Sequence, residues 1–435
     1  GVTRAGPDYR KGRDIDSNEF REAFGFRGVE FGNWMTQADR QQTMNHAYDG
    51  LMDLATAMGI PPLAVSLNGH LAAAFGARGL GGQGAAAHYE PTRRVFNLTK
   101  LSGQGSLAHE WGHAFDDYIG TMTGVATNSV PFATDLRKKP NNTLRPEVLS
   151  ALRNAMDVIR SIPATAEQEI ADHADNLAKS RKQLGLWFDS WKRAFTQGRN
   201  VRSKKIEPTA AQIQKFSDIL DSAREAVVPG DAINEAAELW GSVYGVKVDK
   251  ETADALRHYA ENIPRRSKII ADLASGAKAP STIRDTNVLA ASKEADTKRS
   301  SPYYATDTEL FARMFEMWVY DRLAADAGKK NVGVSQYLVN NISEAEAASP
   351  MYWQGVHAFG TERTAIGKAM GELVASLRVQ DTVDGEVTAD APVKTNASVS
   401  ERAMSTLERI AADAAARMEA RAKKRGARLY STIIP

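Results

Sequence analysis

Apolar residues recur at helical spacing over most of the chain. The spacing predicts one helix from Arg40 to Met58 and another from Asp307 to about Ala325. Between Pro146 and about Ala277, Ala, Leu, Glu, Lys and Arg dominate, which predicts an all-helical middle region. Its breaks fall near Ile162-Pro163, Glu207-Pro208 and Pro229-Gly230.

Strand patterns are fewer and shorter. The run Leu63 to Leu67 lies between Pro62 and Asn68-Gly69 and predicts a strand. Two more strands are expected over Ala85–Tyr89 and Arg94–Leu98, within a glycine-rich stretch. A helix from Leu107 to about Ile119 follows, with Ser106 as its N-cap. The pattern therefore predicts an α+β fold that is mostly helical, with one small twisted sheet.

Polar segments predict the connections. Residues 278–301 are rich in Ser, Thr, Lys and Asp and predict a loop. Residues 379–398 predict a linker, and residues 399–435 a C-terminal helical segment. Residues 126–300 are expected to form a large helical insertion between two parts of a core, 1–125 and 301–378.

Composition excludes several kinds of chemistry. The 435 residues contain no cysteine, which rules out disulfides, iron–sulfur clusters, Cys-ligated zinc and a thiol nucleophile. Lysine plus arginine is 55 and aspartate plus glutamate is 53, a net charge of +2 that gives no whole-chain reason to expect nucleic-acid or membrane binding. No apolar run approaches the length of a membrane span, and no leader pattern is present.

The chemistry-bearing motif is His109-Glu110-Trp111-Gly112-His113, an H-E-x-x-H pattern. Residues four apart lie on one face of a helix, so both imidazoles can reach one zinc ion. Glu110 lies beside the first ligand and can take a proton from a zinc-activated water. This arrangement predicts peptide hydrolysis with Glu110 as the general base.

A catalytic zinc needs a third protein ligand. The metzincin position, six residues after His113, is Ile119, which excludes that class. The other histidines are isolated and are interpreted as core or surface residues. Glu309 opens the helix that starts at Asp307 and is the best candidate, with Glu316 two turns later as the alternative. Asp116 or Asp117 could orient an imidazole from the second shell.

The histidine pair, together with the later Glu-x-Phe-Ala-x-x-Phe helix, resembles the gluzincin metallopeptidases, especially the anthrax lethal factor-like branch. This resemblance implies that Glu309 is the third zinc ligand. It also implies an upstream tyrosine that stabilises the oxyanion, either Tyr303 or Tyr304. Many gluzincins have an acidic second-shell residue four positions after the ligand, where this chain has Arg313.

A second resemblance covers residues 4–120 and is to the zincin domains of large polyvalent proteins of phages, prophages and conjugative elements. It is carried by Arg4-Ala5-Gly6-Pro7-Asp8-Tyr9-Arg10, Phe24 to Gly32, Phe75 to Gly79, and Asn97 to Lys100. It implies a zincin upper subdomain over 1–125, a lower subdomain over 301–378 and a mobile-element peptidase in the bacterial cytoplasm. In that fold an edge strand binds extended substrate, for which we expect Ala86 and His88, with Arg78 as a further substrate contact.

A run of basic residues indicates an alternative function. Nine basic residues and one acid lie between Lys179 and Lys205, with Trp187 and Trp191 among them. Such a run is usually a solvated helix face over packed tryptophans, but it could bind nucleic acid or an acidic partner. The alternative function is therefore a binding protein, such as an anti-restriction factor, that keeps a zincin shell without proteolysis.

Overall fold

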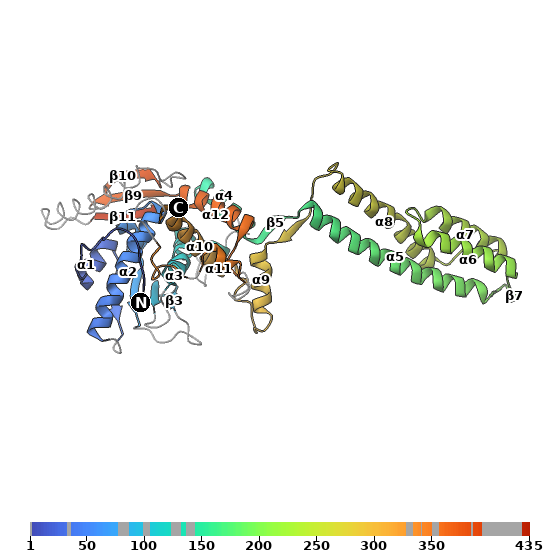
Figure 1. Cartoon of the computed structure of the whole chain (residues 1–435), viewed down its shortest axis with the longest axis horizontal. Coiled ribbons are helices and arrows are strands. Elements are labelled where there is room, and N and C mark those ends of the chain that lie inside the picture. Colours follow the sequence, from blue (N-terminus) through green and yellow to red (C-terminus); the bar gives the residue numbers. More distant parts are fainter. Residues whose placement is uncertain are drawn as a thin grey trace. The chain divides into compact units, whose positions relative to one another are not determined.

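The computed structural model describes residues 2–32, 36–76, 87–98, 105–122, 132–135, 144–327, 334–340, 342–349, 356–383, 386–393 and 429–435. The chain divides into two compact units, labelled by element in Figure 1. Unit 1 comprises residues 1–162 and 285–435, and unit 2 comprises residues 163–284. The division therefore falls at 163 and 284, whereas the sequence places the insertion at 126–300. The expected α+β class with mostly helical content is confirmed.

The larger sheet of unit 1 has the strand order β1-β2-β4-β3. Its strands are β1 (Val29–Phe31), β2 (Ala72–Phe75), β4 (Val95–Leu98) and β3 (Ala87–Glu90). β1, β2 and β4 are parallel, and β3 pairs antiparallel with β4 at the edge of the described sheet. The strand predictions near 85–89 and 94–98 therefore correspond to β3 and β4.

Leu63–Leu67 does not form a strand. Pro62–Ser66 is a 3₁₀ helix, η1, and Leu67 after it has a left-handed φ of 51°. The run is apolar because Ala64, Val65 and Leu67 pack into the core, and periodicity alone cannot separate a short buried helix from a buried strand. The neighbouring strand is instead β2, an almost all-alanine segment.

Helices cover the core of unit 1. They include α1 (Ser17–Phe24), α2 (Gln37–Met58), α3 (Leu107–Met122), α4 (Pro146–Arg160), α10 (Asp307–Ala327), α11 (Glu344–Ala347) and α12 (Gly360–Ala375). α3 packs on α10, and α4 packs on α12. The predicted helices at Arg40–Met58, Leu107–Ile119 and Asp307–Ala325 are confirmed within a few residues at their ends.

The predicted loop at 278–301 contains the helix α9 (Asn287–Asp296). The Thr286 side chain caps this helix by accepting a hydrogen bond from the Leu289 N–H at 3.1 Å. Val288, Leu289 and Ser292 are buried within unit 1. The loop prediction was wrong here because it rested on polar composition, whereas the N-cap and the buried residues stabilise a helix.

The predicted linker at 379–398 is also wrong over its first part. β9 (Arg378–Val383) and β10 (Glu386–Pro392) pair antiparallel, and β11 (Leu429–Ile434) pairs with the other side of β9. Residues 429–434 are therefore a strand and not part of a C-terminal helix. The rest of that predicted helix, 399–428, lies outside the described residues. β11 lies about fifty residues after β9 in the chain, so their pairing leaves no pattern in the local sequence that predicts a strand.

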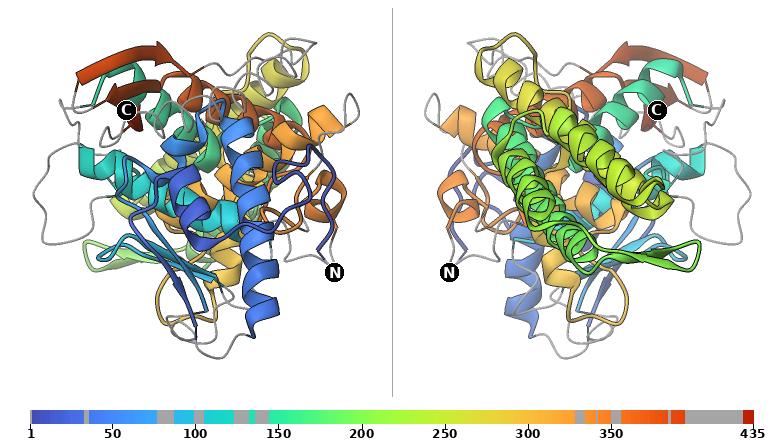
Figure 2. Two further views of the ribbon diagram at one scale, coloured as in Figure 1. Left: turned by 90° about the vertical axis from the view of Figure 1, so that its left-hand side faces the viewer. Right: turned by 90° about the vertical axis from the view of Figure 1, so that its right-hand side faces the viewer.

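Unit 2 is a helical body in which α5 (Ala166–Thr196) and α8 (Lys250–Ala274) run side by side (Figure 2). α6 (Ala210–Glu225) and α7 (Gly230–Tyr244) pack near them. The starts of α6 and α7 match the predicted breaks at Glu207-Pro208 and Pro229-Gly230, whereas no break was predicted at the end of α7. Aromatic residues form a separate core, namely Phe188, Trp191, Phe195, Phe216, Trp240 and Tyr244. A hairpin, β6 (Arg199–Val201) and β7 (Lys204–Ile206), joins α5 to α6. It was not expected from the sequence.

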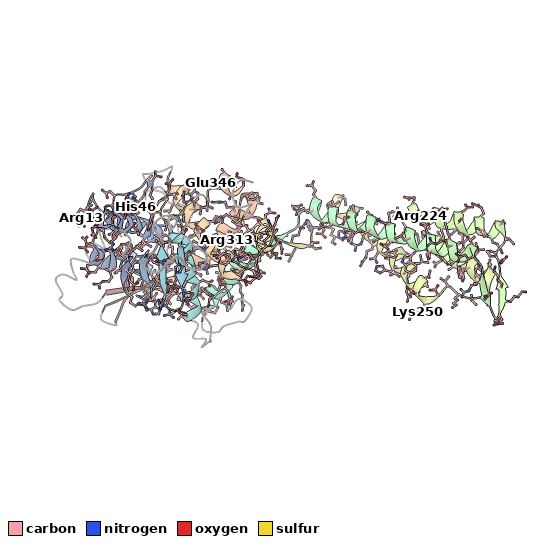
Figure 3. The ribbon with its side chains drawn as sticks, turned by 90° about the horizontal axis from the view of Figure 1, so that it is seen from below. Arg13, His46, Arg224, Lys250, Arg313 and Glu346 are labelled. Carbon is pink, nitrogen blue, oxygen red and sulfur yellow. The ribbon has the colours of Figure 1, made fainter. Side chains whose placement is uncertain are left out.

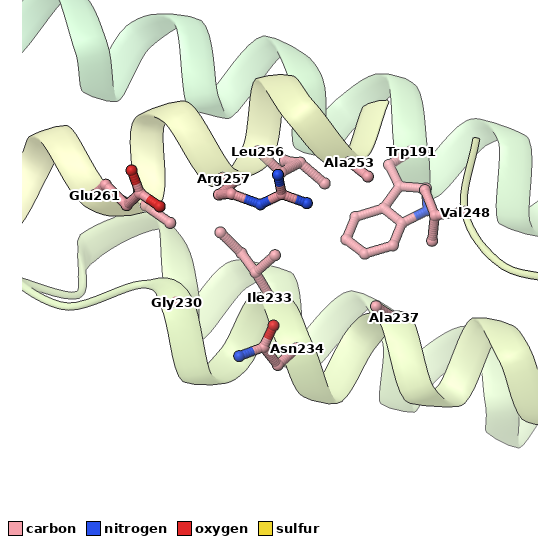
Figure 4. A pocket seen from close by; sticks show the side chains of 11 residues that line it. Trp191, Gly230, Ile233, Asn234, Ala237, Val248, Ala253, Leu256, Arg257 and Glu261 are labelled. Carbon is pink, nitrogen blue, oxygen red and sulfur yellow. The ribbon is translucent and has the colours of Figure 1, made fainter. Parts of the chain in front are cut away.

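A pocket of about 320 Å³ lies among α5, α7 and α8 of unit 2. Trp191 lines one end of it and Glu261 the other (Figure 4). The chain leads into unit 2 through β5 (Ser161–Pro163) and out through β8 (Ile283–Asp285), and these two strands pair. Among the described residues, no helix combines the length and apolar character that crossing a membrane requires.

Candidate metal centre

Two helices carry the site. α3 packs one face into the core through Trp111, whose indole N–H donates to the Val65 carbonyl at 2.9 Å. The Trp111 ring stacks on Phe315 of α10, with ring centroids 5.4 Å apart. His109 and His113 lie one turn apart and are both only partly buried. The packed face thus fixes the rotation of α3 that directs both imidazoles away from the core.

Gly112 allows the two helices to approach closely. A Cβ atom at this position would lie 3.2 Å from Phe315 Cδ1 and 3.3 Å from Ala312 Cα. Both distances are tighter than ordinary packing, so a larger side chain would separate α3 from α10. The close approach brings Glu309, in the first turn of α10, next to the two histidines.

Three donor groups, two imidazoles and one carboxylate, converge on one point. The Nε2 atoms of His109 and His113 are 3.2 Å apart. Glu309 lies 3.5 Å from His109 Nε2 through Oε1 and 3.4 Å from His113 Nε2 through Oε2. Ligands of a tetrahedral zinc ion with bonds of about 2.0–2.1 Å lie about 3.3 Å from one another. The residues therefore fit a single metal ion, and these three form a potential metal-binding group.

Glu316, two turns after Glu309 on α10, does not join the three donor groups. Its Oε2 lies 3.3 Å from Nδ1 of His109, on the opposite side of the ring from the donor cluster. A carboxylate at Nδ1 favours the tautomer that leaves Nε2 free to bind a metal. Glu316 thus contacts His109 in the way that Asp116 or Asp117 was expected to contact an imidazole.

Asp116 and Asp117 bond elsewhere. Asp116 is fully buried and accepts hydrogen bonds from the N–H and hydroxyl of Thr134 at 2.9 and 2.8 Å. Burial raises the pKa of Asp116 to about 8. Asp117 accepts from the Tyr89 hydroxyl at 2.5 Å and from Thr121 at 3.1 Å. These contacts tie α3 to its surroundings and, through Tyr89, to β3.

The charge state of the cluster follows from burial and pairing. Burial alone would raise the pKa of Glu309, but His109 and His113 outweigh it and hold that pKa well below its ordinary value. Burial likewise lowers the pKa of His109, yet Glu309 and Glu316 together raise it well above its ordinary value. A carboxylate that stays ionised at neutral pH is the state that binds a cation.

Glu110 is 5% exposed and lies in the first turn of α3. Burial raises its pKa, an effect that the two histidines partly offset. A carboxylate with a raised pKa is a better proton acceptor at neutral pH than an ordinary glutamate. It is outside the donor cluster, as the role of a general base requires.

Arg313 occupies the position where many gluzincins have an acidic residue. It is buried in unit 1 (labelled in Figure 3) and lies 3.7 Å from Glu309 Oε1 through Nε. Its other nitrogens donate to the Val356 carbonyl at 2.6 Å, to the Ser292 hydroxyl at 3.1 Å and to the Tyr304 carbonyl. Arg313 therefore ties α9, the segment before α10 and the segment at 356 to the ligand helix.

The two tyrosines have different surroundings. Tyr303 is 44% exposed, and its pKa is raised by partial burial, by the charges of Glu309 and Glu110, and by a hydrogen bond with Glu309. Tyr304 instead lies under the guanidinium of Arg313, 5.9 Å from the ring centroid. Of the two alternatives, Tyr303 is the one whose side chain reaches the donor cluster.

A strand, β3, lies at the edge of the described sheet, where the sequence placed substrate binding, which stays a prediction. β3 contains His88, whose Nε2 lies 3.4 Å from Glu90. His88 lies close enough to Glu110 that the charge of its imidazole lowers the pKa of Glu110. Ala86 and Arg78, the other expected contacts, lie outside the described residues.

His357 is a site residue that the sequence did not reveal. Its Nε2 lies 3.6 Å from Glu316 Oε2, and burial lowers its pKa. Glu316 thus lies between two imidazoles. His357 was treated as an isolated histidine because no motif connects it with a helix forty residues earlier.

Several residues of the basic run in unit 2 form ion pairs. Lys179 binds Asp175 at 2.6 Å, Lys192 binds Asp221 at 2.5 Å, and Lys205 binds Glu207 at 2.5 Å. The acid in the run, Asp189, binds Arg224 at 2.5 Å (labelled in Figure 3). These contacts suit a solvated face, and partner binding by the run stays a prediction.

Part of the chain matches a known protein family. Residues 295–381 match a family described as large polyvalent protein-associated domain 1, which ties the chain to polyvalent proteins. The matched segment contains Glu309, Arg313, Glu316 and His357, but not the two histidines of α3. No curated protein and no solved structure matches the chain.

Proposed function

We propose that this chain is a zinc-dependent endopeptidase with a gluzincin-like zincin core. The observation that carries the proposal is the convergence of two imidazoles and one carboxylate on two helices that Gly112 allows to touch. The two Nε2 atoms lie 3.2 Å apart, and each lies 3.4–3.5 Å from one oxygen of the Glu309 carboxylate. His109, His113 and Glu309 would hold the ion. Two imidazoles and one carboxylate leave a tetrahedral position open, as catalytic zinc sites do.

When bound by His109, His113 and Glu309, zinc would supply Lewis-acid activation of a water molecule and of the scissile carbonyl. Glu110 accepts the proton of the attacking water and passes it to the leaving amine. The Tyr303 hydroxyl donates a hydrogen bond to the oxyanion that develops on the former carbonyl oxygen. Glu316 holds the His109 ring, and Arg313 holds the start of α10.

The edge strand β3 suggests how substrate binds. An edge strand offers unpaired backbone groups, so an extended peptide can add to the sheet next to Glu110. We therefore propose protein substrates in an extended conformation. The match to a polyvalent-protein family favours an origin in a phage or other mobile element and action inside a bacterial cell.

The test is the Glu110→Gln variant of the zinc-loaded protein, assayed with a peptide library. The variant keeps its zinc, because Glu110 is no ligand, while kcat/KM falls by about 10²–10⁴-fold. Glu251→Gln, at an exposed glutamate in unit 2, is the matched control and cleaves normally. Undiminished cleavage by Glu110→Gln would refute the mechanism.

A further inference from the structure

The segment that carries Tyr303 is held by one carboxylate. Asp296, the last residue of α9, accepts three consecutive backbone N–H groups. Its Oδ1 lies 3.0 Å from the nitrogens of Tyr303 and Tyr304, and its Oδ2 lies 2.9 Å from the nitrogen of Ala305. The Asp296 side chain is 8% exposed, so these bonds are largely shielded from water.

Further contacts fix the same segment. Thr306 donates its hydroxyl to the Tyr303 carbonyl at 2.7 Å, and Arg313 donates to the Tyr304 carbonyl. The guanidinium of Arg299 lies over both tyrosine rings, 5.0 Å from the centroid of Tyr303 and 5.7 Å from that of Tyr304. The backbone of Tyr303 is thus bonded on both sides, while its side chain reaches Glu309.

We infer that Asp296 is a positioning residue that fixes the Tyr303 hydroxyl beside the donor cluster. The inference rests on the proposed function. A donor that is already in place when the oxyanion forms stabilises the transition state without a cost of reorganisation. Three charge-assisted hydrogen bonds to one buried carboxylate provide such preorganisation for a tyrosine on a loop.

An asparagine at 296 is nearly isosteric but has only one acceptor oxygen. Its NH₂ group would face a backbone N–H, so at least one of the three bonds is lost. The loop then samples other positions, and the Tyr303 hydroxyl is less often in place. Asp296→Glu keeps both acceptor oxygens at a shifted position and retains part of the effect.

The experiment compares wild type, Asp296→Asn, Asp296→Glu, Tyr303→Phe and the Asp296→Asn/Tyr303→Phe double variant on one peptide selected from the library. Asp285→Asn is the control, because Asp285 lies near the other end of α9 and bonds the exposed Lys293. We expect Tyr303→Phe to lower kcat by about 10²-fold. Asp296→Asn lowers kcat at least tenfold, with zinc content and KM within twofold of wild type.

The double variant separates positioning from general stability. If Asp296 acts through Tyr303, its substitution lowers kcat no further once the hydroxyl is gone. Hydrogen exchange at residues 303–305 is also faster in Asp296→Asn. If Asp296→Asn has wild-type kcat, or if the two losses multiply in the double variant, the inference is wrong. If zinc-loaded wild type cleaves no peptide, the proposed function itself fails and the inference falls with it.

Discussion

Two imidazoles whose Nε2 atoms lie 3.2 Å apart face one carboxylate. Without a metal, Glu309 and Glu316 favour the protonated form of His109, because they raise its pKa well above the ordinary value. A divalent cation held by the Nε2 atoms would displace the Nε2 proton of His109 and leave the proton on Nδ1, beside Glu316. At the residue scale, a metal ion and a proton therefore compete for the same ring nitrogen.

Glu316→Gln tests whether that carboxylate supports the metal. An amide can still contact Nδ1 but lacks the charge that makes the imidazole a stronger ligand. We expect zinc affinity to fall about 10–100-fold, measured by competition with a chromogenic chelator. Glu372→Gln, at a half-exposed glutamate of α12, serves as the control. If both variants bind zinc with the affinity of wild type, Glu316 does not support metal binding.

Asp116 predicts a pH dependence of stability. Burial raises its pKa from an ordinary 3.8 to about 8 in the folded protein. Between these values the folded state holds a proton that the unfolded state has released, so this group lowers the free energy of unfolding as pH rises, by about 1.4 kcal/mol per pH unit. The decrease ends above about pH 8.

The Asp116→Asn variant lacks this contribution to the pH dependence of the free energy of unfolding, because an amide does not ionise. Denaturant unfolding of the metal-free protein between pH 5 and pH 9 should show a shallower loss of stability in the variant. The exposed Asp157→Asn should follow wild type throughout. Parallel curves for Asp116→Asn and wild type would show that the carboxyl ionises normally.

At the scale of elements, the sequence predicts what depends on local pattern. α2, α3 and α10 follow from helical spacing, and the i, i+4 histidines on α3 follow from the same periodicity. β11 pairs with β9 from about fifty residues further along the chain, so no local pattern indicated that strand. β9 and β10 are neighbours in sequence, and their polar, proline-containing composition was misread as a linker. The contact between Glu316 and His357 resembles the β9–β11 pairing, because only packing brings residue 357 to α10.

Gly112 offers a test of the α3–α10 contact. A valine there would collide with Phe315 and the backbone of Ala312, so we expect Gly112→Val to destabilise unit 1 by about 1–3 kcal/mol and to weaken zinc binding. Gly367→Val is the matched control, because a Cβ on that helical glycine of α12 meets nothing within 4 Å. Thermal unfolding and zinc titration measure both effects. Equal behaviour of the two variants would contradict the close approach.

At the scale of the whole molecule, the candidate site lies entirely within unit 1. All three donors, Glu110 and Tyr303 come from its two sequence segments, which unit 2 interrupts. Unit 2 has its own aromatic core. The chain enters and leaves it at neighbouring positions, since the Ala164 N–H donates to the Thr282 carbonyl at 2.9 Å. This organisation is typical of an insertion that the host unit can fold without.

Replacing residues 164–282 with a short glycine-containing turn should therefore leave unit 1 folded. We expect the shortened protein to bind one zinc ion per chain, with an affinity close to that of the full chain. Circular dichroism, thermal unfolding and metal analysis provide the measurements. An aggregated product, or a folded one that binds no zinc, would show that the site depends on unit 2.

The metal centre is tested most directly by anomalous X-ray diffraction at the zinc edge on crystals grown with zinc. We expect one strong peak about 2.0–2.2 Å from Nε2 of His109, Nε2 of His113 and a carboxylate oxygen of Glu309. A zinc peak elsewhere, or none among these three residues in zinc-loaded crystals, would contradict the metal centre and the peptidase proposed from it.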